Sequence, residues 1–399
     1  MTAPADARPG LGAGRIEVDL GAIRHNAEVL RATTAVALIA VVKADGYGHG
    51  MVACARAAKR GGAEWLATAT PEEAVALRQA GLEGPILCWL TVPGTDLAPA
   101  IEAGIDLTAY STDELDTIAA AAAGLDRLDL RTPRVQLKVD TGLSRGGAPR
   151  SAWPALFARA AAGEREGRWR ITGIWSHFAS SDEPEHPAND EQEGRFREAL
   201  ALAEDAGLTP EIRHLANSAA AILRPSARFD AVRCGIALYG LDPAPGHTSD
   251  LGLVPAMTAR AELAMVKDLA PGDAVSYGRI WIADHATTVG LVPVGYGDGI
   301  PRHASSPDPA TSAEVGVGGK NRPIRGRVCM DQFVVDLGGD RPAPGSDVLL
   351  FGPPSLGGPT AQDWAEACGT INYEIVTRIG GRMARIYVDS EPMQPMEKS

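Results

Sequence analysis

The sequence predicts an α/β protein that consists of a (β/α)8 TIM-type barrel followed by a mostly β C-terminal domain. The chain of 399 residues is too long for one ordinary hydrophobic core. Apolar strand-like stretches alternate with helix signals as far as Gly240, and short strands separated by turns follow it. With 45% apolar and 22% charged residues, the composition is that of a globular protein.

The N-terminal region predicts a tail and one isolated strand. Residues 1–14 are rich in Pro, Ala and Gly, and they predict a disordered tail that is not a secretory signal. A short strand follows at residues 15–18, and Asp19 is placed to cap a helix with apolar residues at helical spacing. We assign residues 15–250 to the barrel and 251–390 to the second domain. The alternative for the first strand is that it packs with the C-terminal domain.

Eight further apolar stretches predict the barrel strands, at residues 35–42, 65–69, 85–90, 106–110, 134–140, 171–177, 212–216 and 231–234. Helix start signals lie between them, such as Pro71 with two acidic residues and the cluster that begins at Ser111. A barrel of about 240 residues has the usual size for this fold. A doubly wound open sheet is the structural alternative, but no Gly-x-Gly-x-x-Gly follows the first strand.

The second domain is predicted to contain strands at residues 257–267, 274–277, 286–294, 332–337, 347–351 and 385–388. Between them, residues 307–321 are rich in Gly, Ser and Pro and predict a mobile surface loop.

Charge and cysteine content exclude several classes of function. The net charge of −12 argues against nucleic acid or an anionic membrane as a partner, and no apolar run reaches membrane-spanning length. The cysteines lack metal-ligand spacing, so we expect buried free thiols in a reducing cytosol and no bound metal. These cysteines are Cys54, Cys88, Cys234, Cys329 and Cys368.

Unusual residues follow the predicted barrel strands, where the chemistry of such a fold is located. Lys43 ends the first strand, directly before a glycine-rich turn. A lysine at the mouth of an apolar strand loses hydration, so its pKa falls and its amine can act as a nucleophile. The alternative is an ordinary surface lysine. Other strand ends carry Lys138 and Arg145, His177 and Asp182, Asn217 and Ser218, and Arg233, Gly235 and Ile236. Their corresponding positions predict a single site.

Several of these residues also have simpler interpretations. Ser218 and the amides of Gly235 and Ile236 suit a phosphate, but Asn217-Ser218 could be a plain helix cap. His177 could be a core histidine, and Arg233 could form a salt bridge at the barrel rim.

Together these motifs resemble the alanine racemases, which are pyridoxal-phosphate (PLP) enzymes of fold type III, over about residues 15–388. The resemblance implies that Lys43 binds PLP and also acts as a base, that His177 lies against the pyridine ring, and that Arg233 donates to the pyridine nitrogen. The implied cofactor-binding residues are Lys43, Tyr47, His177, Asn217, Ser218, Arg233, Gly235, Ile236 and Tyr373.

The resemblance also gives roles to three basic residues. Arg233 cannot accept a proton, so it leaves the pyridine nitrogen neutral and favours reprotonation at Cα over transamination. Lys138 matches a lysine that many members carry as a carbamate, and a lysine within a barrel strand is costly unless paired. That carbamate would orient Arg145 near the substrate carboxylate.

In the second domain, Val275-Ser276-Tyr277-Gly278 matches the segment that supplies the second base, and packing is the alternative for this tyrosine. The amide of Met330 would hold the substrate carboxylate. The implied entrance residues are Asp182, Tyr296, Arg302 and Arg327. The chain departs from the family pattern at Leu143-Ser144, at Trp281 and at Met383-Ala384.

The resemblance therefore implies a cytoplasmic isomerase that interconverts L- and D-alanine with two bases, Lys43 and Tyr277, and supplies D-alanine for peptidoglycan. It also implies a homodimer in which the partner's Tyr277 and the partner's Met330 complete each site. A broad-spectrum amino-acid racemase is the nearest alternative, although such enzymes are typically exported. A PLP decarboxylase would need an acidic partner for the pyridine nitrogen, and a non-catalytic PLP-binding barrel would lack the second domain.

Overall fold

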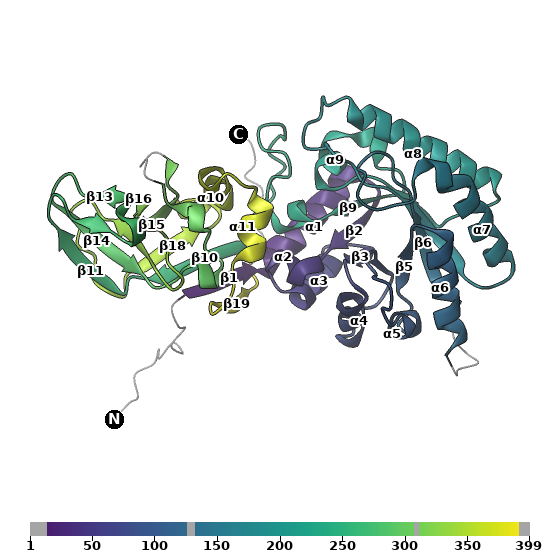
Figure 1. Ribbon diagram of the computed structural model, residues 1–399, viewed down its shortest axis with the longest axis horizontal. Coiled ribbons are helices and arrows are strands. Elements are labelled where there is room, and N and C mark those ends of the chain that lie inside the picture. Colours follow the sequence, from purple (N-terminus) through teal and green to yellow (C-terminus); the bar gives the residue numbers. More distant parts are fainter. Residues whose placement is uncertain (1–13, 126–131, 307–310, 391–399) are drawn as a thin grey trace. The chain divides into compact units, whose positions relative to one another are not determined.

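The computed structural model describes residues 14–125, 132–306 and 311–390 and contains two compact units (Figure 1). One unit comprises residues 23–253, and the other comprises residues 1–22 together with 254–399. Most of the predicted tail lies outside the described residues, but Gly14 is already the first residue of a strand.

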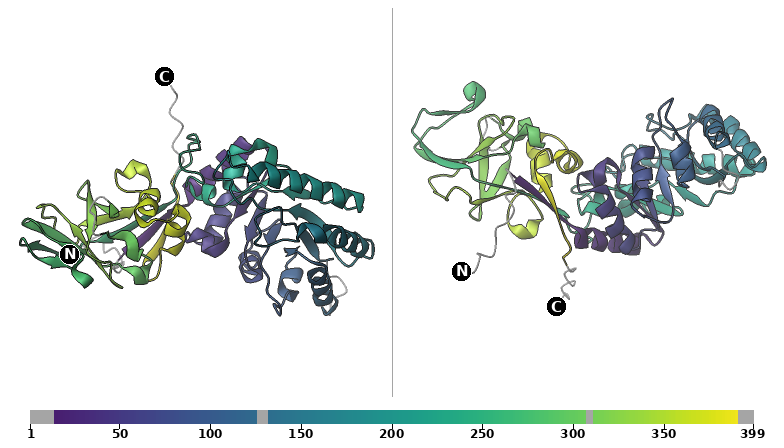
Figure 2. Two further views of the ribbon diagram at one scale, coloured as in Figure 1. Left: turned by 45° about the horizontal axis from the view of Figure 1, so that its top comes forward. Right: turned by 90° about the horizontal axis from the view of Figure 1, so that it is seen from below.

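The first unit is a closed barrel of eight parallel strands, as predicted (Figures 1 and 2). The first and last strands of the series pair with each other, which excludes the doubly wound open sheet. The strands are β2 (Ala37–Val41), β3 (Trp65–Thr68), β4 (Ile86–Cys88), β5 (Asp106–Ala109), β6 (Arg134–Lys138), β7 (Arg170–Trp175), β8 (Ile212–His214) and β9 (Ala231–Cys234).

Helices surround these strands, and three of them, α1, α4 and α6, begin with side-chain caps at or next to the start signals that the sequence shows. Asp19 Oδ1 accepts from the Gly21 and Ala22 amides at the start of α1. Thr70 forms a capping box, and Ser111 accepts from a backbone amide one turn on. The helices are α1 (Leu20–Thr34), α2 (Lys43–Tyr47), α3 (Met51–Arg60), α4 (Pro71–Gln79), α5 (Ala98–Glu102), α6 (Thr112–Ala123), α7 (Trp153–Arg165), α8 (Ala188–Asp205) and α9 (Ser218–Leu223), with 3-10 turns η1 (Arg150–Ala152), η2 (Pro225–Ala227) and η3 (Ile236–Tyr239).

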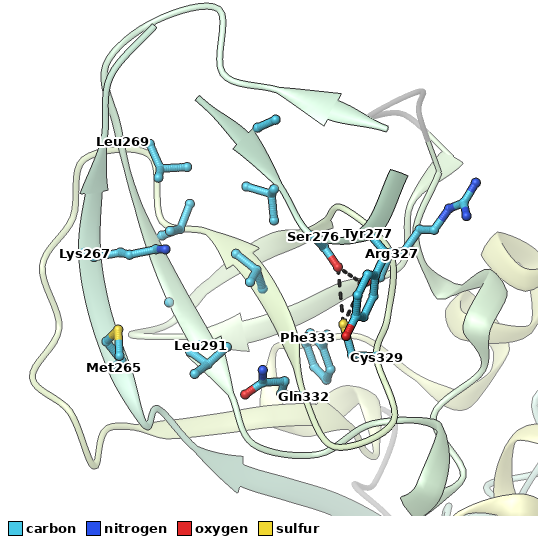
Figure 3. Close-up of a pocket in the computed structure, with 15 residues that line it drawn as sticks. Met265, Lys267, Leu269, Ser276, Tyr277, Leu291, Arg327, Cys329, Gln332 and Phe333 are labelled. Carbon is cyan, nitrogen blue, oxygen red and sulfur yellow. Dashed lines mark hydrogen bonds between the residues drawn. The ribbon is translucent and has the colours of Figure 1, made fainter. Parts of the chain in front are cut away.

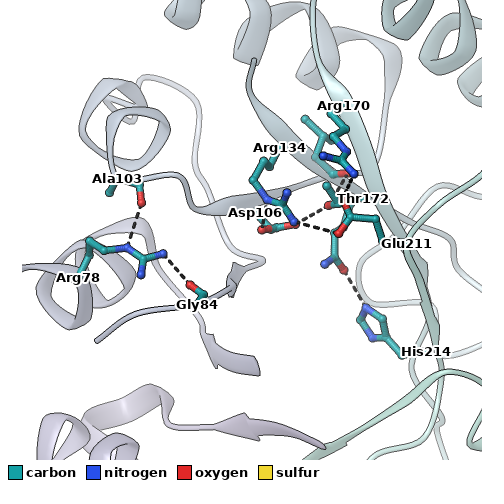
Figure 4. A network of polar contacts seen from close by, with 11 residues as sticks. Arg78, Gly84, Ala103, Asp106, Arg134, Arg170, Thr172, Glu211 and His214 are labelled. Carbon is teal, nitrogen blue, oxygen red and sulfur yellow. Dashed lines mark hydrogen bonds and ion pairs between the residues drawn. The ribbon is translucent and has the colours of Figure 1, made fainter. Parts of the chain in front are cut away.

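A cluster of charged residues lies at the N-terminal ends of neighbouring barrel strands (Figure 4). The fully buried Asp106 accepts from Arg134 Nε at 2.8 Å and from the Thr172 hydroxyl. Arg134 and Arg170 both pair with Glu211. Burial raises the pKa of Asp106, and Arg134 opposes that shift. These residues begin or precede their strands, so the cluster lies at the opposite end from the predicted chemistry.

The second unit is built on a nine-stranded sheet with the order β11-β14-β17-β16-β15-β18-β10-β1-β19. The strand β1 (Gly14–Asp19) pairs with β10 and β19, so it follows the alternative assignment made from the sequence. The other strands are β10 (Met257–Glu262), β11 (Met265–Leu269), β14 (Thr287–Val292), β15 (Glu314–Val317), β16 (Lys320–Arg325), β17 (Phe333–Asp336), β18 (Asp347–Phe351) and β19 (Ala384–Val388).

A two-stranded sheet, two helices and several 3-10 turns complete this unit. They are β12 (Ala274–Val275), β13 (Trp281–Ile282), α10 (Ala361–Cys368), α11 (Asn372–Arg378), η4 (Tyr277–Arg279), η5 (Tyr296–Asp298), η6 (Arg302–Ala304) and η8 (Pro354–Leu356). No helix among the described residues is long and apolar enough to cross a membrane.

Three local predictions were wrong. The strand predicted at 257–267 is two strands, β10 and β11. They are separate because β10, which ends at Glu262, pairs with β18, whereas β11 pairs with β14. The loop predicted at 307–321 contains β15 and the start of β16, which are joined by Gly318 and Gly319, both with positive φ. Its residues 307–310 lie outside the described part. Cys329 and Cys368 are partly exposed, whereas the other cysteines are buried as predicted.

Candidate active site

Lys43 lies at the first turn after β2, where the backbone is unusual. Ala44, Asp45 and Gly46 have φ values of 53°, 52° and 63°. A carboxylate oxygen of Glu73 accepts from the Ala44 amide at 2.7 Å and so helps to hold this turn. Burial and the charge of Arg145 lower the pKa of Lys43, while Glu73 acts in the opposite direction. The turn therefore presents an amine that loses its proton more easily than an exposed lysine does.

Tyr47, Ser218, Gly235 and Ile236 come together beside this turn. A Cβ placed on Gly235 would lie 2.2 Å from the Tyr47 hydroxyl, so only glycine fits there without movement. The Ser218 hydroxyl accepts from the Gly235 amide at 3.0 Å. Burial raises the pKa of Tyr47, which keeps its hydroxyl a hydrogen-bond donor. Asn217 Oδ1 accepts from the Ala220 amide and so caps α9, as the simpler interpretation of this residue predicts.

Both terminal nitrogens of the Arg233 guanidinium donate hydrogen bonds to acceptors in the barrel. Nη1 donates to His214 Nδ1 at 2.8 Å, and Nη2 donates to His177 Nδ1 at 3.0 Å. Backbone carbonyls of His214, Ser176 and Leu215 accept the remaining bonds. No carboxylate of the described chain pairs with Arg233, which excludes the rim salt bridge. The hydrogen bonds that Arg233 makes to the described residues use Nη1 and Nη2, and none of them uses Nε.

The two histidines that accept hydrogen bonds from Arg233 are neutral. Burial and the charge of Arg233 lower the pKa of both His177 and His214 well below the ordinary value. Since Nδ1 accepts in each ring, the proton is on Nε2, and His214 Nε2 donates to Gln136 Oε1 at 2.7 Å. Sequence reasoning missed the roles of His214 and Gln136. The available signal was the alternation of Gln136 and Lys138 with the apolar Val135 and Leu137 in a largely buried strand.

Lys138 is the centre of a cluster of positive charge. Its side chain is buried, and its Nζ lies 4.4 Å from the centre of the Trp175 ring. Burial, Arg233 and Arg145 lower the pKa of Lys138 to about 8. Lys43 contributes to the same shift, whereas Asp140 opposes it. The cluster therefore holds more basic than acidic groups, which makes it suited to an anionic ligand.

Two tryptophans that the sequence analysis did not single out line this cluster. The Trp175 ring also lies 4.7 Å from Arg233 Cζ and 5.9 Å from the Trp89 ring. Lys43 Nζ in turn lies 5.6 Å from the centre of the Trp89 ring. These aromatic surfaces exclude water from the lysines and account for part of their burial.

The remaining predicted residues belong to the second unit. Tyr277 begins η4 one residue after the end of β12, and the residue is 72% exposed. The Ser276 hydroxyl donates to the Arg327 carbonyl at 2.6 Å and so joins the Tyr277 turn to the segment that leads to Met330 (Figure 3). A largely apolar cavity of about 540 Å³ lies beside Tyr277.

Tyr296 lies on a segment that contacts the Met330 segment through the backbone. The Tyr296 amide donates to the Cys329 carbonyl at 3.0 Å, and the Gly297 amide donates to the Met330 carbonyl at 2.9 Å. Arg302 begins η6, and Tyr373 lies in the first turn of α11. The predicted residues thus form two groups. Those in the barrel unit are Lys43, Tyr47, Lys138, Arg145, His177, Asp182, Asn217, Ser218, Arg233, Gly235 and Ile236, and those in the other unit are Tyr277, Tyr296, Arg302, Arg327, Met330 and Tyr373.

Comparison with known proteins gives a consistent family assignment. Residues 18–243 match the model of the alanine racemase N-terminal domain, and residues 256–387 match that of the C-terminal domain. An alanine racemase from Streptomyces coelicolor is 53% identical over 97% of this chain and 99% of its own.

Solved structures agree with this result. The alanine racemase of a D-cycloserine-producing Streptomyces lavendulae is 49% identical, with a TM-score of 0.90 over 94% of this chain and 97% of its own. The Bacillus anthracis alanine racemase, solved with bound L-Ala-P, is 33% identical, with a TM-score of 0.83 over 98% of this chain and 97% of its own. This chain therefore belongs to the alanine racemase family.

Proposed function

We propose that this protein is a PLP-dependent alanine racemase that interconverts L- and D-alanine and supplies D-alanine for peptidoglycan. The observation that carries the proposal is the hydrogen bonding of Arg233. Both of its terminal nitrogens are bound to protein acceptors, so we assign the remaining donor, Nε–H, to the ligand. A neutral acceptor such as a pyridine nitrogen suits this donor, because the guanidinium stays protonated at neutral pH.

The barrel residues fit PLP in their chemistry. The Lys43 amine has a lowered pKa and suits covalent attachment of a carbonyl group. The Tyr47 and Ser218 hydroxyls and the Ile236 amide suit a phosphate, because the close approach of Tyr47 to Gly235, whose own amide donates to Ser218, gathers these groups at one place. When bound, PLP supplies an acceptor for the electrons released at Cα.

Racemisation then needs a proton to be removed from one face of Cα and returned to the other. Lys43 serves the face from which D-alanine loses its proton, and Tyr277 serves the face from which L-alanine does. Arg145 and the amide of Met330 bind the substrate carboxylate. The presence of arginine at position 233 argues against a PLP decarboxylase, because such an enzyme would need a carboxylate there to keep the pyridine nitrogen protonated.

Lys138 is the proposed site of a carbamate. A pKa of about 8 leaves a substantial fraction of the amine unprotonated near neutral pH, and the unprotonated amine is the form that attacks CO₂. The new N–C bond forms with release of a proton to solvent, and the resulting anion offsets the charges of Arg145 and Arg233. Protein equilibrated with ¹³CO₂ should show a carbamate carbon resonance that is absent from Lys138→Met. If both proteins give the same spectrum, Lys138 is not modified.

The exposure of Tyr277 and Met330 supports a homodimer. Their side chains are 72% and 54% exposed, which is unusual for groups that exchange a proton or hold a substrate carboxylate. In the proposed head-to-tail dimer, the partner's Tyr277 and the partner's Met330 complete the site that contains Lys43.

The direct test of the activity is chiral analysis. Purified protein saturated with PLP should convert either enantiomer of alanine to an equal mixture, measured by chiral chromatography. The gene should also restore growth of a bacterium that requires D-alanine. A protein that binds PLP but leaves L-alanine unchanged would contradict the proposal.

A further inference from the structure

Arg382 links the two segments that carry Met330 and Tyr296, and the proposed mechanism gives it no role. We infer that Arg382 is a positioning residue that fixes the Met330 amide for the carboxylate of the substrate. This inference rests on the proposed function, in which that amide contacts the substrate.

The two segments are in direct backbone contact. Besides the hydrogen bonds from the Tyr296 and Gly297 amides, a Cβ on Gly295 would lie 2.2 Å from the Cys329 carbonyl oxygen and 2.4 Å from that of Met330. Such contact leaves no room for a side chain between them. The position of the Met330 peptide therefore depends on the contacts that hold the Tyr296 segment and the Met330 segment together.

Arg382 spans both segments with charge-assisted hydrogen bonds. Its Nε and Nη2 donate to the two carboxylate oxygens of Asp298, both at 2.8 Å. Its Nη1 donates to Asp331 Oδ1 at 2.7 Å. Asp331 directly follows Met330, and Asp298 ends the turn that begins at Tyr296. One guanidinium thus joins the turn of Tyr296 to the residue next to Met330.

The two ends of this bridge are built differently. The Asp298 side chain is 1% exposed and also accepts from the Gly295 amide, so it holds the Arg382 guanidinium in a fixed position. Although burial acts to raise the pKa of Asp298, the hydrogen bonds from Arg382 and from backbone amides keep it lowered. The pair of Arg382 with Asp331 is 58% and 62% exposed. An exposed pair contributes little to stability, so its loss should affect the Met330 segment without unfolding the protein.

The test compares two substitutions of Asp331 in the PLP-loaded enzyme. Asp331→Ala removes the acceptor and should raise both the KM for alanine and the inhibition constant of propionate by about five-fold, with little change in kcat. Asp331→Asn keeps an acceptor oxygen and should retain most of the affinity. Arg382→Lys should resemble Asp331→Ala, because one ammonium group cannot span both carboxylates.

Asp268→Ala is the matched control, since Asp268 is 59% exposed and pairs with Arg341 in the same unit. It should leave the KM, the propionate inhibition constant and the melting temperature unchanged. The inference is wrong if Asp331→Ala binds propionate as tightly as wild type, or if the Ala and Asn variants are equally weakened. Absence of racemisation in the wild-type protein would instead contradict the proposed function.

Discussion

Replacement of Gly235 by alanine tests whether the close approach to Tyr47 matters for the cofactor. The added methyl group would lie 2.2 Å from the Tyr47 hydroxyl and 2.8 Å from its Cζ, so the phenol must move. The ring of Tyr47 is only 9% exposed and packs 4.9 Å from the ring of Tyr239, which limits where it can go. Loss of one hydrogen bond to a charged phosphate costs about 1.5–3 kcal/mol, which corresponds to an affinity for PLP that is roughly 10- to 150-fold weaker.

The assay is titration of the apoenzyme with PLP, followed by the visible absorbance of the bound cofactor. Gly194→Ala is the control, because nothing lies within 4 Å of the position that its methyl group would take on α8, and it should bind PLP normally. Tyr47→Phe loses the same hydroxyl, so Gly235→Ala combined with Tyr47→Phe should be little weaker than Tyr47→Phe alone. Unchanged PLP affinity in Gly235→Ala, or full additivity of the two substitutions, would refute this reasoning.

Three further predictions concern the lysines and the dimer. Lys43→Ala should lose both the absorbance of covalently bound PLP and racemisation, and near-normal turnover would contradict the assignment of Lys43. Because burial lowers the pKa of Lys138 from 10.5 to about 8, the unfolded apoprotein binds more protons between these pH values. The urea midpoint should therefore rise with pH in that window, and Lys138→Met should reduce the rise. Subunit exchange between Lys43→Ala and Tyr277→Phe proteins should restore roughly a quarter of the wild-type activity, because about half the dimers are mixed and each has one intact site. An inactive mixture after proven exchange would place the whole site within one chain.

The barrel could be predicted because its signals are local. Each strand is a short apolar run, and each helix has its own capping residues, such as Thr70 and Ser111. The order of these elements then restricts the fold to very few topologies. The hairpin of β15 and β16 was missed for a related reason. A glycine-rich stretch predicts a loop, whereas Gly318 and Gly319 form the tight turn that joins two strands.

The contacts that shape the site could not be predicted in the same way. Arg233, His214 and Gln136 come from three different strands, and their hydrogen bonds depend on side-chain register within a buried barrel. The bridge formed by Arg382 joins residues that are 51 and 84 positions away in the chain. Composition and periodicity describe neighbours along the sequence, so they carry little information about such pairs.

The position of β1 has a consequence for how the chain folds during synthesis. The barrel unit is one continuous stretch, residues 23–253, so all of its contacts can form before the rest of the chain is made. In contrast, β1 lies between β10 and β19 and pairs in parallel with β19. β1 therefore leaves the ribosome before either of its neighbours. Both of its edges stay unpaired until β10 is made, and one edge stays unpaired until β19 follows. The alternating charges of β1, at Arg15, Glu17 and Asp19, would help to keep this waiting strand from pairing with other chains.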